Sequence, residues 1–477
     1  MNASSETQRR PHGAARLGSA QQLQQQLLRF GLHGTLFLCG LCAWIFKLKG
    51  DGSAEGGLLP YSPLQMLIPL LGMLALLWLA CIYGGGLPRL TTGTPSARCL
   101  QIGIGLMVLG ASLHLRGSGG KEAALFIVRW LLPPAFLLFY VLTRYYRASP
   151  VALLLGLAGG AVLSALSVEA VRNAGVGFPI SAPVAGRYGG YLNHPNQYGI
   201  LCSVTAPILL FFYHSRSRLA HLASVFLLPV YLLCLFQNLS KTNIFLFFVA
   251  LVAGSLALSL KNPRKLLGTL AMTVGLAVFL VLIAGLAMNT LNDYSPKAAK
   301  TLENALLDPT EARSVDSRQE VWDTALHIIR DRPLFGLGPG KSLDALGIAH
   351  AHNMLLQAYL DAGLAGFVGM CLVVLGILGR AVELLRAELR SRGEISDEQR
   401  LRLLSGLALV IYLFANSMSD SFSTATMPVF MFFAAITFAP EKTDASDPES
   451  NAPSAIPLRG ERRRKFPLKA PADPDAP

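Results

Sequence analysis

Polar sequence gives way to apolar sequence within residues 341–379, KSLDALGIAHAHNMLLQAYLDAGLAGFVGMCLVVLGILG. A long polar segment ends here, and an apolar run long enough to cross a bilayer begins at His352-Asn353. Nine residues separate Asn353 from Gly363-Leu364-Ala365-Gly366. A histidine at such a boundary often only caps a helix or lies among lipid headgroups, so its meaning depends on the rest of the chain.

The composition is that of an integral membrane protein. Hydrophobic residues make up 52% of the chain and charged residues only 14%, outside the range of soluble domains. Since about 20 apolar residues cross the hydrocarbon core, we predict an all-α, polytopic membrane helix bundle of about twelve transmembrane helices. The weakest candidates are 99–115 and 424–439. The predicted spans are 31–47, 64–84, 99–115, 123–142, 150–170, 197–213, 219–237, 242–260, 266–290, 352–379, 402–420 and 424–439.

The distribution of positive charge predicts the orientation of these spans. If the N-terminus lies in the cytoplasm, most of the 41 Lys and Arg residues, including Arg144, Arg147 and those in 380–402, fall on the same side. Cytoplasmic loops carry this excess, so both termini are expected in the cytoplasm. The net charge of +13 then reflects topology, and no nucleic-acid partner is expected.

The spans divide the chain into segments of different character. We predict a cytoplasmic N-terminal segment (1–30), spans 1–9 (31–290), a periplasmic helical loop (291–350), spans 10–12 (351–440) and a disordered cytoplasmic tail (441–477). The loop is too long for an ordinary connection, which suggests a function.

Within this loop the sequence predicts an amphipathic helix. Ser317-Arg318-Gln319-Glu320 has the spacing of a capping box. An apolar stripe at helical spacing follows, and its face is expected to rest on the bundle or on the bilayer surface. The stripe consists of Val321, Trp322, Ala325, Leu326, Ile328 and Ile329. Farther on, Gly336-Leu337-Gly338-Pro339-Gly340-Lys341 is better explained as a tight turn than as a phosphate-binding loop, because no strand precedes it.

The segments predicted to face outward carry fixed positive charge as well as a histidine. Arg187 lies in the connection 171–196, Lys241 follows Ser240 at the start of a span, and Arg318 lies in the long loop. A single cation at a span end usually does no more than reach the lipid interface. Three of them facing outward with His352 favour a site for an anionic substrate. Clustered carboxylates are missing from these segments, so no metal and no other cofactor is expected.

Such a set of groups suits glycosyl transfer from a lipid diphosphate. The leaving diphosphate needs only charge stabilisation, which arginine supplies through bidentate N–H donors. The acceptor hydroxyl needs a general base, and histidine, with an unperturbed pKa of about 6.5, can serve at pH 7. Attack from the side opposite the diphosphate would invert the anomeric centre in one step.

An ordered set of motifs over residues 180–380 carries a family resemblance. They are Gly186-Arg187, Asn193, Pro195-Asn196, Ser240-Lys241, Ser317-Arg318-x3-Trp322, Pro333-Leu334-x-Gly336-x-Gly338 and His352-Asn353-x9-Gly363-x2-Gly366. This set resembles the bacterial O-antigen ligase and O-antigen polymerase superfamily, and most closely the O-antigen ligase. The resemblance implies a multi-pass inner-membrane bundle with a helical periplasmic domain. It also implies transfer of glycan from undecaprenyl diphosphate.

The resemblance also implies roles for individual residues. His352 matches the proposed general base, with His350 as a rival. If a helix begins near residue 351, the two histidines lie on different faces and only one reaches the site. Lysine stands at 241 where the family commonly has arginine, so Lys241 keeps the charge but loses the bidentate fork. The residues expected to bind diphosphate or substrate are Arg187, Arg318, Lys241, Asn353 and Asn196, and Gly363 and Gly366 are expected to be structural.

The superfamily leaves several activities open. We favour a ligase, which joins O-antigen to the lipid A–core oligosaccharide, because the chain has one dominant periplasmic loop and no further domain is expected after the last span. The alternatives are a polymerase of O-antigen or exopolysaccharide, and a protein O-oligosaccharyltransferase. A transporter of lipid-linked oligosaccharide is less favoured, because it would need charges deep in several spans and internal repeats. Arg129 lies within a span, and we expect a structural or interfacial role for it.

Overall fold

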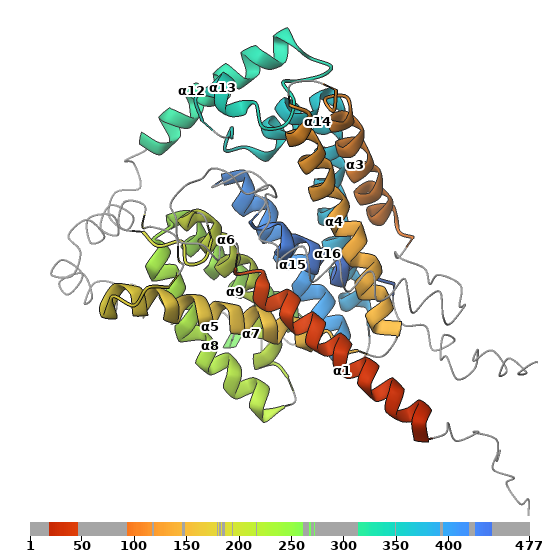
Figure 1. Cartoon of the computed structure of the whole chain (residues 1–477). Helices are drawn as coiled ribbons and strands as arrows, with labels where there is room; N and C mark the ends of the chain where they lie inside the picture. The colour runs from red at the N-terminus through yellow and green to blue at the C-terminus, as the bar shows by residue number, and fades with distance from the viewer. Residues whose placement is uncertain are drawn as a thin grey trace, which may run out of the picture. The chain divides into compact units, whose positions relative to one another are not determined.

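The structure, a computed structural model, consists of helices joined by turns (Figure 1). It describes residues 19–45, 93–116, 119–145, 148–178, 180, 183, 187–192, 194–215, 217–260, 267–268, 271, 313–348, 350–391, 395–418 and 425–440. The elements all belong to one unit, Met1–Ala439. The predicted span 64–84, most of 266–290, the start of the long loop and the tail lie outside the described residues.

The all-α prediction is confirmed for the described residues. The helices are α1 (Ser19–Cys42), α3 (Pro95–Ser112), α4 (Gly120–Tyr145), α5 (Val151–Ala174), α6 (Pro195–Thr205), α7 (Pro207–Tyr213), α8 (Arg218–Asn238), α9 (Lys241–Ser259), α12 (Arg313–Asp331), α13 (Ser342–Leu346), α14 (Met354–Arg390), α15 (Asp397–Met418) and α16 (Met427–Phe438). Within this part of the chain, 6 helices are long and apolar enough to cross a membrane: α4, α5, α8, α9, α14 and α15. A membrane protein with several spans is therefore confirmed, whereas the count of about twelve stays a prediction.

Several predicted spans have other boundaries in the structure. The span predicted at 197–213 is two helices, α6 and α7, that meet at Ala206. The break lies at Pro207, which lacks the N–H that a continuous helix would use. Helix α1 begins at Ser19, within the segment predicted to be polar and terminal, and α14 continues to Arg390, well past the predicted end.

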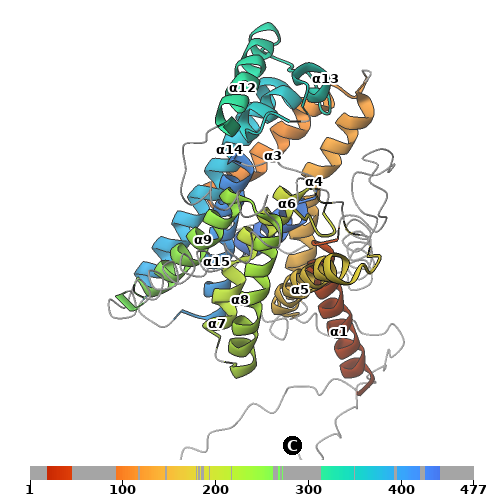
Figure 2. The same cartoon turned by 90° about the vertical axis from the view of Figure 1, so that its left-hand side faces the viewer.

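Small residues allow α3 and α14 to pack closely. Helix α14 runs alongside α3 (Figure 1, Figure 2). Where they meet, a Cβ on Gly103 would lie 2.6 Å from the Gly369 carbonyl oxygen, and one on Gly369 would lie 2.7 Å from that of Gly103. The two backbones can approach this closely only because both positions are glycine.

Ion pairs join the ends of helices that the charge distribution assigns to the cytoplasm. Arg144, at the end of α4, pairs with Glu398 at the start of α15, and Arg402 donates to the same carboxylate at 2.9 Å. Arg400 donates to the carbonyl of His214, just after α7, at 2.7 Å. The loops predicted to share one side of the membrane are thus in contact with one another.

Candidate functional site

The amphipathic helix of the long loop is α12, and its apolar face packs on the start of α14. Ala325 is fully buried and, with the apolar residues beside it on α12, packs against Ala351 and Leu360. The prediction that this face rests on the bundle is therefore confirmed. The predicted capping box is wrong, because α12 already begins at Arg313 and Ser317 lies inside the helix.

The glycine-rich segment after α12 is a turn that docks on α14. The backbone N–H groups of Leu337 and Gly338 donate to the carbonyl of Leu360, at 2.7 and 3.1 Å. Gly336 has a φ of 67° and lies so close to α14 that a Cβ would collide with the carbonyl of Tyr359. A turn was the favoured interpretation, and the structure confirms it.

The Gly363-x2-Gly366 motif marks a kink inside α14. Gly363 has φ 62° and ψ −155°, which interrupts the helix, and a Cβ there would collide with the carbonyl of Leu334. Leu364 N–H donates to that carbonyl at 3.2 Å. A Cβ on Gly366 would collide with the carbonyl of Ala358, eight residues earlier on the other side of the kink. A side chain at either position would collide with a backbone carbonyl, which accounts for both glycines. The positive φ at Gly363 is a second reason for glycine there.

His352 lies in the short segment that leads into α14. The helix begins at Met354, and the Asn353 side chain caps it by accepting from the N–H groups of Leu355 (3.0 Å) and Leu356 (3.2 Å). His352 has a φ of 50°, in the left-handed region that residues with a Cβ seldom adopt. Such conformations persist only where the surroundings impose them, and they often occur at functional sites.

His350 and His352 lie against each other. Their ring centroids are 4.8 Å apart and their planes are at 76°. Helix α14 begins only at Met354, after both histidines, so the condition under which the two would lie on different helix faces is not met. The two imidazoles therefore lie side by side ahead of α14.

The backbone next to His352 is held by side chains that sequence reasoning did not single out. Gln357 accepts from the Ala351 N–H at 2.9 Å and donates to Asp361 at 2.8 Å. Both side chains are buried. Asp361 also interacts electrostatically with His350 and with Arg129 of α4. The sequence does offer one sign of the importance of Asp361, because an acidic residue inside an apolar span is often functional.

Arg318 lies on α12, the helix that packs against the segment containing His352. One turn after Arg318, Trp322 donates from its indole Nε1 to the Ala351 carbonyl at 2.8 Å. Residues four apart lie on the same face of a helix, so Arg318 shares the face of α12 that meets the His352 segment. Partial burial lowers the pKa of Arg318.

Arg187 is fixed in a second group of polar residues. Its Nε donates to the Asn238 carbonyl at 2.6 Å, and its Nη2 donates to Asn196 Oδ1 at 2.7 Å. Asn243, which is fully buried, donates to the Asn196 carbonyl at 3.2 Å. Burial lowers the pKa of Arg187, because the charged form loses hydration. Lys241 is exposed at the first turn of α9, beside this group.

The predicted site residues therefore fall into two clusters. The Arg187 cluster consists of Arg187, Asn196, Asn238 and Asn243, with Lys241 at its edge. The His352 cluster consists of His350, His352, Asn353, Gln357 and Asp361, with α12 packed on it. These hydrogen bonds join members of the same cluster. Helix α15 packs against both α6 and α14. Asn193 and Gly186 lie outside the described residues.

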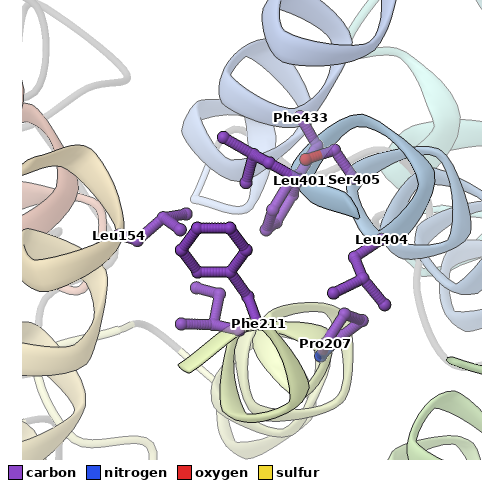
Figure 3. A pocket seen from close by; sticks show the side chains of 8 residues that line it. Leu154, Pro207, Phe211, Leu401, Leu404, Ser405 and Phe433 are labelled. Carbon is purple, nitrogen blue, oxygen red and sulfur yellow. The ribbon is translucent and has the colours of Figure 1, made fainter. Parts of the chain in front are cut away.

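A small cavity lies away from these clusters. It lies between α5, α7, α15 and α16 (Figure 3). Its lining is apolar apart from Ser405 and holds no predicted site residue, so it contributes no chemistry to the site. The lining residues are Leu154, Pro207, Ile208, Phe211, Leu401, Leu404, Ser405 and Phe433.

Comparison with known proteins gives one family. Residues 203–371 match the family model described as O-antigen ligase, and no curated protein matches the chain. The matched segment holds Lys241, Arg318, His352 and both glycines of the kink, whereas Arg187 and Asn196 precede it. The chain therefore carries a domain of the O-antigen ligase family, which confirms the resemblance drawn from its motifs.

Proposed function

We propose that this protein is an O-antigen ligase of the bacterial inner (cytoplasmic) membrane. It moves O-antigen glycan from undecaprenyl diphosphate to a hydroxyl of the lipid A–core oligosaccharide, with its site facing the periplasm. The observation that carries the proposal is His352, held in a left-handed conformation where α12 meets α14. It lies inside the segment that matches the family.

The proposed reaction uses His352 as general base. A neutral imidazole takes the proton of the acceptor hydroxyl as the oxygen attacks the anomeric carbon. The bond from that carbon to the diphosphate breaks, and the leaving group keeps the electron pair. Attack opposite the leaving group inverts the anomeric centre, and the groups assigned here perform the step without a metal.

The arginines stabilise the charge of the diphosphate. The two acceptors bound by Arg187 are a carbonyl and an amide oxygen, both neutral, so its positive charge favours an anionic ligand. Arg318 comes from α12 on the side of the base, and Lys241 adds a point charge at the rim. A donor bound between the two clusters would meet cations from both.

The two asparagines act mainly by holding other groups. Asn196 accepts from the Arg187 guanidinium and fixes its direction. Asn353 caps α14 and fixes the backbone that follows His352. We therefore assign Asn196 and Asn353 indirect roles in substrate binding, rather than direct contacts with the glycan.

The decisive experiment is deletion of the gene followed by examination of lipopolysaccharide and lipid-linked glycan. A ligase predicts core that lacks O-antigen while undecaprenyl-linked polymer accumulates, with rescue by wild type but not by His352→Ala. Core that bears a single repeat would instead assign a polymerase. Normal lipopolysaccharide with loss of glycan from a secreted protein would assign an O-oligosaccharyltransferase.

A further inference from the structure

The peptide groups of Ala351, immediately before His352, are held from two sides. We propose that Gln357 and Trp322 form a clamp on Ala351 that keeps His352 in its left-handed conformation and so positions the imidazole. The clamp rests on the proposed role of His352 as the base. Gln357 and Trp322 are then positioning residues, which act through His352.

The side-chain amide of Gln357 can bond Ala351 in only one of its two orientations. Its Oε1 accepts from the Ala351 N–H, and its Nε2 donates to Ser342 Oγ (2.9 Å) and to Asp361 Oδ1 (2.8 Å). With the amide reversed, two donors would face each other at Ala351, and two oxygens would face each other at Asp361. The network therefore fixes the position of the acceptor that Ala351 uses.

Trp322 holds the other side of the same residue. Its indole Nε1 donates to the Ala351 carbonyl at 2.8 Å. Ala351 is fully buried, so in the intact protein its N–H and C=O are bonded by these side chains and not by solvent. The N–H and the C=O of Ala351 are thus tied to different helices, α14 and α12.

The clamp matters because His352 does not adopt its conformation by preference. A side chain with a Cβ is crowded at a φ of 50°. Freed from restraint, the residue would return to an ordinary helical or extended conformation, and its imidazole would move away from its present position. The clamp before His352 and the Asn353 cap after it leave little freedom between them.

Arg129 and Asp361 connect this clamp to the membrane bundle. Asp361 is buried in α14, bonds Gln357 and interacts electrostatically with Arg129 of α4. Arg129 also lies 4.8 Å from the centre of the Phe126 ring. This places a half-buried cation, in electrostatic interaction with a buried acid, behind the network that orients Gln357, and gives Arg129 a structural role.

The test uses variants of the full-length protein in detergent or nanodiscs. Trp322→Phe removes the indole donor and keeps a ring, and Gln357→Met removes the amide and keeps the length. Gln357→Glu/Asp361→Asn exchanges the carboxylate and the amide, so that an acceptor for Ala351 and a bond between 357 and 361 are both restored. Ile329→Val is the matched control, because Ile329 packs on the same apolar cluster without bonding to Ala351.

The first readout is the kinetics of transfer. Trp322→Phe and Gln357→Met are expected to lower kcat by about 10- to 100-fold, as for a displaced catalytic group, with little change in the KM for donor. The exchanged pair recovers most of kcat, and Ile329→Val keeps it. Thermal unfolding verifies that each variant is folded.

The second readout does not depend on activity. Diethyl pyrocarbonate modifies accessible imidazoles, and the rate at His352, measured by mass spectrometry, is compared with that at His327, which is exposed on α12. The relative rate at His352 is expected to change in both single variants and to return in the exchanged pair. An unchanged relative rate in the single variants would overturn the clamp, whatever happens to kcat. Full activity of His352→Ala would refute the proposed function, while the labelling would still decide on the clamp.

Discussion

The two polar clusters hold their functional groups in different ways. In the Arg187 cluster the side chain itself is bonded, because the guanidinium donates to Asn238 and Asn196. In the His352 cluster the neighbouring backbone is held, by Gln357 and Trp322 at Ala351 and by the Asn353 cap. Fixing a guanidinium suits binding of an anion, whereas fixing the backbone leaves an imidazole able to exchange a proton. The first cluster should therefore govern donor affinity, and the second the rate of the chemical step.

The largest expected effect is on the base. His352→Ala should lower transfer by about 1,000-fold, within the range for loss of a general base, and should leave donor binding intact because the base acts on the acceptor. The measurement is initial rate together with binding of lipid-linked donor. His350→Ala is the matched control and should cause a much smaller loss. Equal losses in the two variants would remove the distinction between these neighbouring histidines.

Next in size are the arginines. Arg187→Lys and Arg318→Lys keep the charge but lose bidentate contacts, each of which contributes about 1.5–3 kcal/mol, so kcat/KM should fall about 10- to 100-fold. For Arg187→Lys most of the loss should appear in the KM for donor. Lys241→Arg is the comparison, and it should keep or raise activity. Unchanged kinetics in Arg187→Lys would separate this cluster from the diphosphate.

The third effect is on stability rather than on the transfer reaction, and it concerns the kink that supports the His352 cluster. Gly363→Ala should destabilise the protein by roughly 3 kcal/mol, because a Cβ adds overlap with Leu334 to the strain of a positive φ. Gly347→Ala has a similar φ, 70°, with open space around it, so it should lose only about 1 kcal/mol. Thermal unfolding of the purified variants gives the comparison. Equal shifts in the two would mean that the contact with Leu334 contributes nothing.

The smallest expected effect is none. If cations alone stabilise the diphosphate and an imidazole serves as the base for the acceptor, purified protein treated with EDTA should transfer glycan at the untreated rate. The measurement is the initial rate before and after chelation, with added Mg²⁺ or Mn²⁺ as the control. Loss of activity that a metal restores would contradict the assigned chemistry of both clusters.

The sequence predicted the features that depend on local pattern. Hydropathy gave the all-helical membrane class, the spacing of Ala325 and Ile328 gave the apolar face of α12, and the glycines of 336–340 gave a turn. Each of these features depends on a short stretch of sequence, whose periodicity or backbone freedom determines the local structure.

Features that depend on distant partners could not be predicted in this way. The bonds from Arg187 to Asn238 and from Trp322 to Ala351 join residues far apart in the chain. Gln357 lies in an apolar run, and its importance appears only when Ser342 and Ala351 are placed beside it. The start of α12 was misplaced because a local capping pattern at Ser317 lies inside a helix that was already formed.

The turn between α12 and α14 has a mechanical consequence. Leu337 and Gly338 are tied to Leu360, and Leu364 is tied to Leu334, on either side of the kink at Gly363. The first turns of α14 are thus fastened to the turn that follows α12, and Trp322 of α12 bonds the segment just before them. A tilt of α12 would carry His352 and Arg318 along as one piece, so their mutual spacing would survive while the gap to Arg187 opened or narrowed.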